Sequence, residues 1–195
     1  MSYKTKSTIR KIIYIILFAV MIFAFIYLGN KYINDDKDKV KLINDYYENI
    51  KSDKYEVING AKFISLIKEG NSVVFVGSKT SYWSKEYIKQ LDKVVNSLDI
   101  KIYYYDLNND KAQKNSNYYD IKDLLKGSLT TTDGSNSNLL APSLYIFDNG
   151  EVKYYNTDTV AMRNTETIET YWTQAQQTKF EIEVTNAINK YYLNN

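Results

Sequence analysis

The stretch SVVFVGSKTSYWSKEYIKQL, residues 72–91, predicts a strand, a tight turn and the beginning of a helix. Residues 72–77 form a run dominated by apolar side chains, which is typical of a strand that is buried on both faces. From Tyr82 onward, apolar residues recur with helical spacing at Tyr87, Leu91, Val94, Val95 and Leu98. Two serines, Ser81 and Ser84, stand at the junction. Because strand-to-helix corners often carry the polar groups of a functional site, this corner is the first candidate.

The segments on either side of the corner alternate between strand and helix patterns. Strands are expected at 55–58 and near 99–107, and helices at 61–70, 82–98 and 118–125. This alternation predicts an α/β fold in layers, with a parallel pair of strands at its centre. From about Asn164 the chain is helical again, and a break is expected near 176–178.

Two further strands give a strong hairpin signal. The runs 143–147 and 151–155 are joined by Asp148, Asn149 and Gly150, and an Asn-Gly step between two such runs predicts a tight β-hairpin. Pro142, the only proline of the sequence, stands directly before the first run. Because proline has no N–H to donate, it is expected at the first residue of a strand or on a sheet edge.

The N-terminal region predicts one membrane-spanning helix. Residues 12–28, IIYIILFAVMIFAFIYL, carry no charge, and Gly29 extends the run to a length that can cross a bilayer. Residues 1–11 contain basic charges and no acidic ones, whereas the charges after the run nearly cancel. The positive-inside rule places residues 1–11 in the cytoplasm and the bulk of the chain outside, at the cell membrane.

A cleavable signal peptide is the rival interpretation of residues 12–29. Its apolar region would be unusually long, and the following GNKYIND offers no small-x-small cleavage site, so an uncleaved signal anchor is favoured. Residues 30–54 are then expected to be a stalk or linker helix that packs on the chain's own domain or on a partner. One helical stripe in it consists of Val40, Ile43, Tyr47 and Ile50.

Composition excludes several kinds of chemistry. The 195 residues include no cysteine and no histidine, which removes disulfides, thiolate nucleophiles, the usual zinc ligands and the commonest general base. The net charge of +2 makes nucleic acid an unexpected partner. Codon bias in an A/T-rich genome is favoured over an aromatic binding surface as the reason for 20 tyrosines.

Two acidic runs raise the question of calcium. One contains Asp35, Asp36 and Asp38, and the other extends from Asp106 to Asp110. An EF-hand loop beginning at Asp106 would need glycine and glutamate at positions that hold a lysine and an asparagine here. Both runs are therefore interpreted as solvated charge, and no metal or cofactor is expected.

The order of these elements resembles a thioredoxin-like domain over roughly residues 55–191. The match is most specific at APSLYIFDNGEV, residues 141–152, which is similar to the family's cis-proline, strand, turn and hairpin in one register. SYWS, residues 81–84, stands where the family has C-x-x-C. With its N-terminal anchor, the chain resembles membrane-anchored thioredoxin-like accessory proteins of Gram-positive bacteria, including bacteriocin-transport accessory proteins. The resemblance implies a three-layer α/β/α domain with a mixed sheet at 55–195, outside the cytoplasm.

The resemblance also implies a corner that has lost its redox chemistry. In the family, a helix N-terminus lowers the pKa of one thiol, and the two sulfurs can bond to each other. Ser81 and Ser84 can do neither, and no histidine is present to activate them as nucleophiles. The buried acid of many relatives would lie at Phe75. We therefore expect no oxidoreductase activity, and Ser81 or Thr80 is expected to cap the helix.

What remains is an expected peptide groove formed by Tyr82, Trp83, Ala141 and Pro142. In relatives, the backbone before the cis-proline pairs with an extended peptide. Trp83 has two interpretations, an exposed apolar contact or ordinary packing. The expected function is that of a redox-inactive adaptor or peptide-binding subunit of a cell-envelope export, bacteriocin or conjugation machine. The alternative is an extracytoplasmic chaperone or holdase for secreted proteins.

Overall fold

The computed structural model describes only part of the chain. The described residues are Tyr14, Phe18, 20–23, 43–48, 50, 52–113, 115–129, 138–157 and 167–194. The chain divides into two units, Met1–Val40 and Lys41–Asn195, and the described residues of the first unit are helical. Among the described residues, no helix is long and apolar enough to cross a membrane. Most of the expected span at 12–29 lies outside the described residues.

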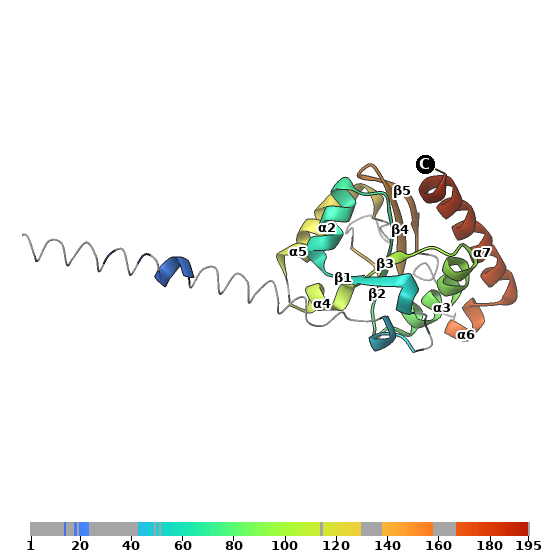
Figure 1. The fold of residues 1–195 in the computed structure, drawn as a ribbon. Helices are drawn as coiled ribbons and strands as arrows, with labels where there is room; N and C mark the ends of the chain where they lie inside the picture. Colours follow the sequence, from blue (N-terminus) through green and yellow to red (C-terminus); the bar gives the residue numbers. More distant parts are fainter. Residues whose placement is uncertain are drawn as a thin grey trace, which may run out of the picture. The chain divides into compact units, whose positions relative to one another are not determined.

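A five-stranded mixed sheet forms the centre of the second unit (Figure 1). The strands are β1 (Tyr55–Ile58), β2 (Ser72–Gly77), β3 (Ile102–Asp106), β4 (Ser143–Asp148) and β5 (Glu151–Asn156). They lie in the order β1-β3-β2-β4-β5. β3 is parallel to β1 and β2, whereas β4 is antiparallel to β2 and β5. The expected parallel pair and the expected hairpin are therefore both present.

Helices cover both faces of this sheet (Figure 1). One face carries α2 (Gly60–Glu69), α4 (Leu107–Ala112) and α5 (Ser116–Leu124). The other face carries α3 (Tyr82–Ser97), α6 (Ile168–Tyr171) and α7 (Gln174–Ile188). The α/β class and the mixed sheet expected from the sequence are confirmed, and the arrangement is consistent with three layers.

Side chains of the central strand alternate between two cores. In β2, Val73 and Phe75 contribute to the core under α3 and α7, whereas Val74 and Val76 contribute to the core under α2 and α5. Successive strand residues point to opposite faces, and both faces of this strand are covered. Double burial therefore explains why residues 72–77 form a continuous apolar run instead of an alternating one.

Both cores are rich in tyrosine. Tyr87, in α3, stacks on Phe75 with ring centroids 5.5 Å apart, and its hydroxyl donates a hydrogen bond to Asn156 Oδ1 at 2.8 Å. On the other face, the Tyr105 hydroxyl donates to Asp110 Oδ2 at 2.7 Å. A buried tyrosine gives a large apolar area, provided that its hydroxyl finds a partner. These tyrosines build the fold and do not form a binding surface.

The segment before β1 differs from the expected stalk helix. Ile43–Asp45 and Ser52–Lys54 are single 3-10 turns. Ile43, Tyr47 and Ile50 are buried in the core on the α3 side of the sheet. The prediction of one continuous helix is therefore wrong over residues 43–50. Contacts with the rest of the domain, and not helical periodicity, determine which side chains are buried there. The alternative of packing on the chain's own domain is confirmed for these three residues, and Val40 lies outside the described residues.

The acidic run after β3 is not the solvated charge that the sequence suggests. Asp106 caps α4 by accepting the N–H of Asn108 at 3.0 Å, and the sequence analysis does not predict this helix. Asp106 and Asp110 are only 1% and 9% exposed. Because each carboxylate accepts hydrogen bonds within the fold, the interpretation as solvated charge is wrong for both. The first acidic run, with Asp35, lies outside the described residues.

Two element boundaries also differ from expectation. β3 begins at Ile102 because Asp99, with a φ of 53°, turns the chain after α3. The C-terminal helical region breaks between α6 and α7, and not near 176–178. Thr173 caps α7 by accepting the N–H of Gln176, which fixes the position of the break.

The turn between β4 and β5 offers a test of the fold. Asn149 and Gly150 both have positive φ, at 50° and 80°, as a tight hairpin turn requires. In Gly150→Ala the new Cβ would lie 2.8 Å from the Lys68 carbonyl oxygen. We expect this variant to lose about 1–3 kcal/mol of unfolding free energy, measured by chemical denaturation. In the control Gly127→Ala, the Cβ meets nothing within 4 Å, and equal losses in the two variants would contradict the turn geometry.

Candidate functional site

The carboxyl ends of the three parallel strands meet at one edge of the sheet, and the candidate corner lies there. Each of β1, β2 and β3 leads at this edge into the start of a helix. The register pairs Gly77 with Asp106, and Val76 with Ser143. Pro142, directly before Ser143, therefore comes to the same edge as the turn that follows β2. Open α/β sheets bind ligands preferentially at this edge.

Ser81 begins α3. Its backbone is extended, and its Oγ accepts the N–H of Ser84 at 3.3 Å. The expected helix cap is thus confirmed for Ser81 and not for Thr80, whose hydroxyl lies 3.2 Å from Ser78 Oγ. A serine cap satisfies one of the unpaired N–H groups of the first turn and stabilises a helix by about 1 kcal/mol.

Ser84 points inward. It is fully buried, and its Oγ accepts the N–H of Ser78 at 3.0 Å. This bond closes the turn from β2 into α3 and satisfies a buried main-chain donor. The two serines therefore have different roles, because the first caps the helix and the second holds the turn. A hydroxyl that accepts an N–H is not activated as a nucleophile, which requires a base to remove its proton.

The core beneath the corner is aromatic. Phe75, where the resemblance implies a buried acid, is packed against the Tyr87 ring. The hydroxyls of Tyr47 and Tyr104 lie 3.2 Å apart in the same core. Burial raises the pKa of both tyrosines well above the usual value, so both hydroxyls stay neutral at physiological pH. At Phe75 the corner has a packed ring and no proton-transfer group.

Two residues that the sequence analysis misses complete the corner. Asn108, in α4, donates its side-chain N–H groups to Ser78 Oγ at 2.7 Å and to Thr80 Oγ1 at 3.0 Å. It thereby ties the turn to the end of β3. The nearest sequence signal is Asp106, a residue type that favours helix N-caps. Tyr47 is the second missed residue, and no local pattern places it beside a turn that lies 30 residues further along the chain.

The two aromatic residues of the expected groove differ in exposure. Tyr82 is 72% exposed, and the Lys85 ammonium lies 5.4 Å from its ring centroid. Trp83 is half-buried, because its ring lies edge-to-face on Tyr171 of α6 at 6.0 Å. Trp83 is therefore mainly a packing residue, and Tyr82 is the aromatic side chain that the corner offers to solvent.

The other two expected groove residues lie at the start of β4. Ala141 is half-buried and Pro142 is buried, and the peptide bond between them is cis, as the resemblance implies. Ser143 Oγ donates to the Leu140 carbonyl oxygen at 2.8 Å and closes this turn. The backbone before Pro142 thus lies at the same sheet edge as the corner.

The acids of this edge act as hydrogen-bond acceptors within the fold. Asp110 accepts from Tyr105 and, at 3.2 Å, from the Asn115 side chain. A Cβ at Gly60, the first residue of α2, would lie 2.3 Å from Asp110 Oδ2, so the carboxylate fits closely against the start of that helix. In the part of the chain that the structure describes, no group of three or more acidic, histidine or cysteine side chains could hold a metal ion.

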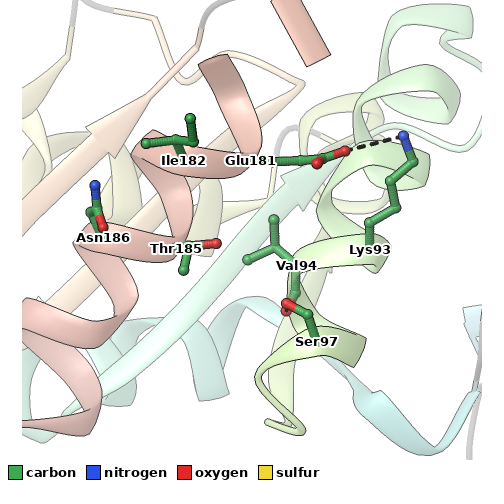
Figure 2. A pocket seen from close by; sticks show the side chains of 7 residues that line it. All are labelled: Lys93, Val94, Ser97, Glu181, Ile182, Thr185 and Asn186. Carbon is green, nitrogen blue, oxygen red and sulfur yellow. Dashed lines mark hydrogen bonds and ion pairs between the residues drawn. The ribbon is translucent and has the colours of Figure 1, made fainter. Parts of the chain in front are cut away.

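A separate hollow of about 430 Å³ lies between α3 and α7 (Figure 2). Its lining residues are Lys93, Val94, Ser97, Glu181, Ile182, Thr185 and Asn186. The Lys93 ammonium and the Glu181 carboxylate form an ion pair at 3.2 Å between the two helices. Lys93 lies about 13 Å along the helix from Ser84, at 1.5 Å per residue. The hollow is therefore remote from the corner, and its two charged groups satisfy each other.

Comparison with known proteins assigns no family to this chain. A scan against protein-family models finds no match, and a search of the curated proteins finds no match either. A functional conclusion therefore comes from the chain's own residues: the strand order, the serine corner and the strand that begins after Pro142.

Single-cysteine variants test the different surroundings of the two serines, because the chain has no cysteine of its own. Ser81→Cys should react readily with a maleimide, since the position is partly exposed and a helix N-terminus lowers the pKa of a thiol. Ser84→Cys should react more slowly, by roughly tenfold or more, because labelling requires local opening of a fully buried position. A mass-spectrometric time course measures both rates, and equal rates would contradict this geometry.

Proposed function

We propose that the chain is a membrane-anchored, thioredoxin-like accessory protein that binds an extended segment of a partner and carries out no redox reaction. The observation that supports this most directly is the meeting of the serine corner and Pro142 at one sheet edge. The order β1-β3-β2-β4-β5, with α3 after β2 and a hairpin after Pro142, supports the resemblance to thioredoxin-like domains.

Binding without electron transfer follows from the chemistry of the corner. Thiol–disulfide exchange needs a thiolate nucleophile and a sulfur atom that it attacks. A serine hydroxyl can serve as neither. Both hydroxyls of Ser81 and Ser84 accept main-chain N–H groups, so they serve the turn itself. In this proposal the corner has a fixed conformation, and it offers a ligand the backbone before Pro142 and the exposed ring of Tyr82.

An extended peptide fits this shape by strand addition. A peptide that pairs with the backbone before Pro142 would lie at the edge where α3 begins, next to the exposed ring of Tyr82. Main-chain pairing gives affinity with little dependence on sequence, whereas contact with the ring favours an apolar or aromatic side chain. The proposed ligand is therefore an extended segment with at least one such side chain.

Residues 12–29 supply the membrane anchor in this proposal, with residues 1–11 in the cytoplasm. The thioredoxin-like domain then acts outside the cell membrane. Its partner is a component of an export, bacteriocin or conjugation machine, and the anchor keeps the domain near that machine. Tethering raises the effective concentration of the domain at its partner, so that a modest intrinsic affinity is sufficient.

A photoreactive amino acid at Tyr82 tests the binding function in cells. Tyr119 is a matched control, because it is also an exposed tyrosine on a helix, 51% exposed and on the other face of the sheet. We expect one dominant membrane-protein product from position 82 and none from position 119. A smear of secreted proteins from position 82 would instead support the holdase, and equal labelling from both positions would exclude a specific site at the corner.

Reduction of insulin tests the absence of redox chemistry. The purified chain should show no activity above background, because neither hydroxyl can form the mixed disulfide that the reaction requires. The rate of turbidity increase in the presence of dithiothreitol measures this directly. A rate above that of dithiothreitol alone would contradict the proposal.

A further inference from the structure

We propose that Tyr47 is a positioning residue for the candidate corner, and that docking of the segment 43–50 against the sheet holds the turn from Ser78 to Ser84 in shape. The assignment of the corner as a peptide site rests on the proposed function above. The coupling between segment and turn rests on geometry alone, and it can be tested separately.

The first observation is how firmly the segment is docked. The Tyr47 side chain is only 3% exposed, and its ring lies edge-to-face on Tyr104 of β3 at 5.4 Å. It also lies 6.4 Å from the Phe75 ring of β2. The neighbouring Tyr46 contacts the same Tyr104 ring at 5.1 Å. Two consecutive tyrosines thus fix the segment to the two central parallel strands.

The second observation is the position of the Tyr47 hydroxyl. It lies 3.2 Å from the Tyr104 hydroxyl. Burial is the main cause that raises the pKa of Tyr47, and hydrogen bonding with Tyr104, with the Ser84 hydroxyl and with the Ser78 main chain acts in the opposite direction. The Tyr47 hydroxyl therefore lies beside the last residue of β2, directly before the turn that the hydrogen bond from the Ser78 N–H to the Ser84 hydroxyl closes.

The third observation is the fit at Gly77, the last residue of β2. A Cβ at this position would lie 2.6 Å from the Tyr47 hydroxyl oxygen and 2.8 Å from the Tyr104 ring. Such a close approach is open only to glycine. The end of β2 and the Tyr47 side chain are thus matched in shape, although 30 residues separate them in the sequence.

Together these contacts make the conformation of the turn 78–84 depend on the segment 43–50, which precedes the first strand. With Tyr47 in place, Gly77 and the turn that follows it have a fixed neighbour in the core. With Tyr47 withdrawn, the turn loses that neighbour while the other face of the sheet keeps its packing. In the sequence, the segment lies between the proposed membrane anchor and β1, so the proposed peptide site depends on residues that follow the anchor along the chain.

Hydrogen exchange of the full chain, in detergent, tests the coupling in Tyr47→Phe, which keeps the ring and removes the hydroxyl. Exchange in peptides that cover 78–84 should accelerate by roughly three- to tenfold, because the hydroxyl that packs against Gly77 and bonds to Tyr104 is removed from the core next to the turn. Exchange in α2 and β5 should not change. No acceleration at 78–84, or the same acceleration in every element, would overturn the proposal.

Tyr55→Phe is the matched control. Tyr55 is a buried tyrosine of the same core, at the opposite end of β1 from the corner, and its hydroxyl lies near Asp92. Burial and then the Asp92 charge raise its pKa. This variant should leave exchange at 78–84 unchanged, and an acceleration there equal to that of Tyr47→Phe would overturn a specific role for Tyr47.

A second variant tests the same coupling by a change at the end of β2 instead of a change at Tyr47. Gly77→Ala places a Cβ against the Tyr47 hydroxyl, so exchange should accelerate both in the segment 43–50 and at 78–84. Acceleration at only one of the two would overturn the coupling. The failure of the proposed function is distinguishable, because an absence of crosslinks from a photoreactive residue at position 82, with Tyr47 and Gly77 unchanged, would leave these exchange results as they are.

Discussion

One hydrogen bond, from the Ser78 N–H to the Ser84 hydroxyl, closes the turn on which the candidate site depends. The bond fixes where β2 stops and where α3 begins, and Ser81 then caps the helix. Asn108 of α4 donates to the same turn, and Tyr47, from the segment before β1, packs against Gly77 directly before it. Three parts of the chain that are distant in sequence therefore meet in one small polar cluster above an aromatic core.

The hydrogen bonds of this cluster stabilise the conformation of the turn. A buried hydroxyl that accepts an N–H avoids the penalty of an unpaired main-chain donor, which is about 1–3 kcal/mol. In the thioredoxin-like proteins on which the proposed function is based, the corresponding two positions carry sulfur, which is reactive. Here the groups below the corner are packed rings and neutral tyrosine hydroxyls. A turn of this kind has no group that a change in redox conditions would alter, which agrees with the location outside the cytoplasm that we propose for the domain.

Local signals predicted the parts of the fold that local physics determines. The apolar run of β2, the Asn-Gly turn and the Ser81 cap each follow from a few neighbouring residues. The failures have a common cause, because they depend on contacts between distant segments. The spacing of Ile43, Tyr47 and Ile50 suited a continuous helix, yet Ile43–Asp45 is a single 3-10 turn and the three apolar residues are buried in the core. From the sequence, Asp106 and Asp110 are interpreted as surface charge. In the fold, Asp106 accepts the N–H of Asn108 in α4, and Asp110 accepts the hydroxyl of Tyr105.

The proposed function requires that the corner and the start of β4 together bind an extended peptide. Amide chemical-shift mapping of the 195-residue chain in detergent, titrated with S-carboxymethylated insulin B chain, tests this claim most directly. We expect saturable shifts concentrated at residues 78–84 and 141–144. Shifts confined to the hollow between α3 and α7, or no saturable shifts at millimolar peptide, would contradict it.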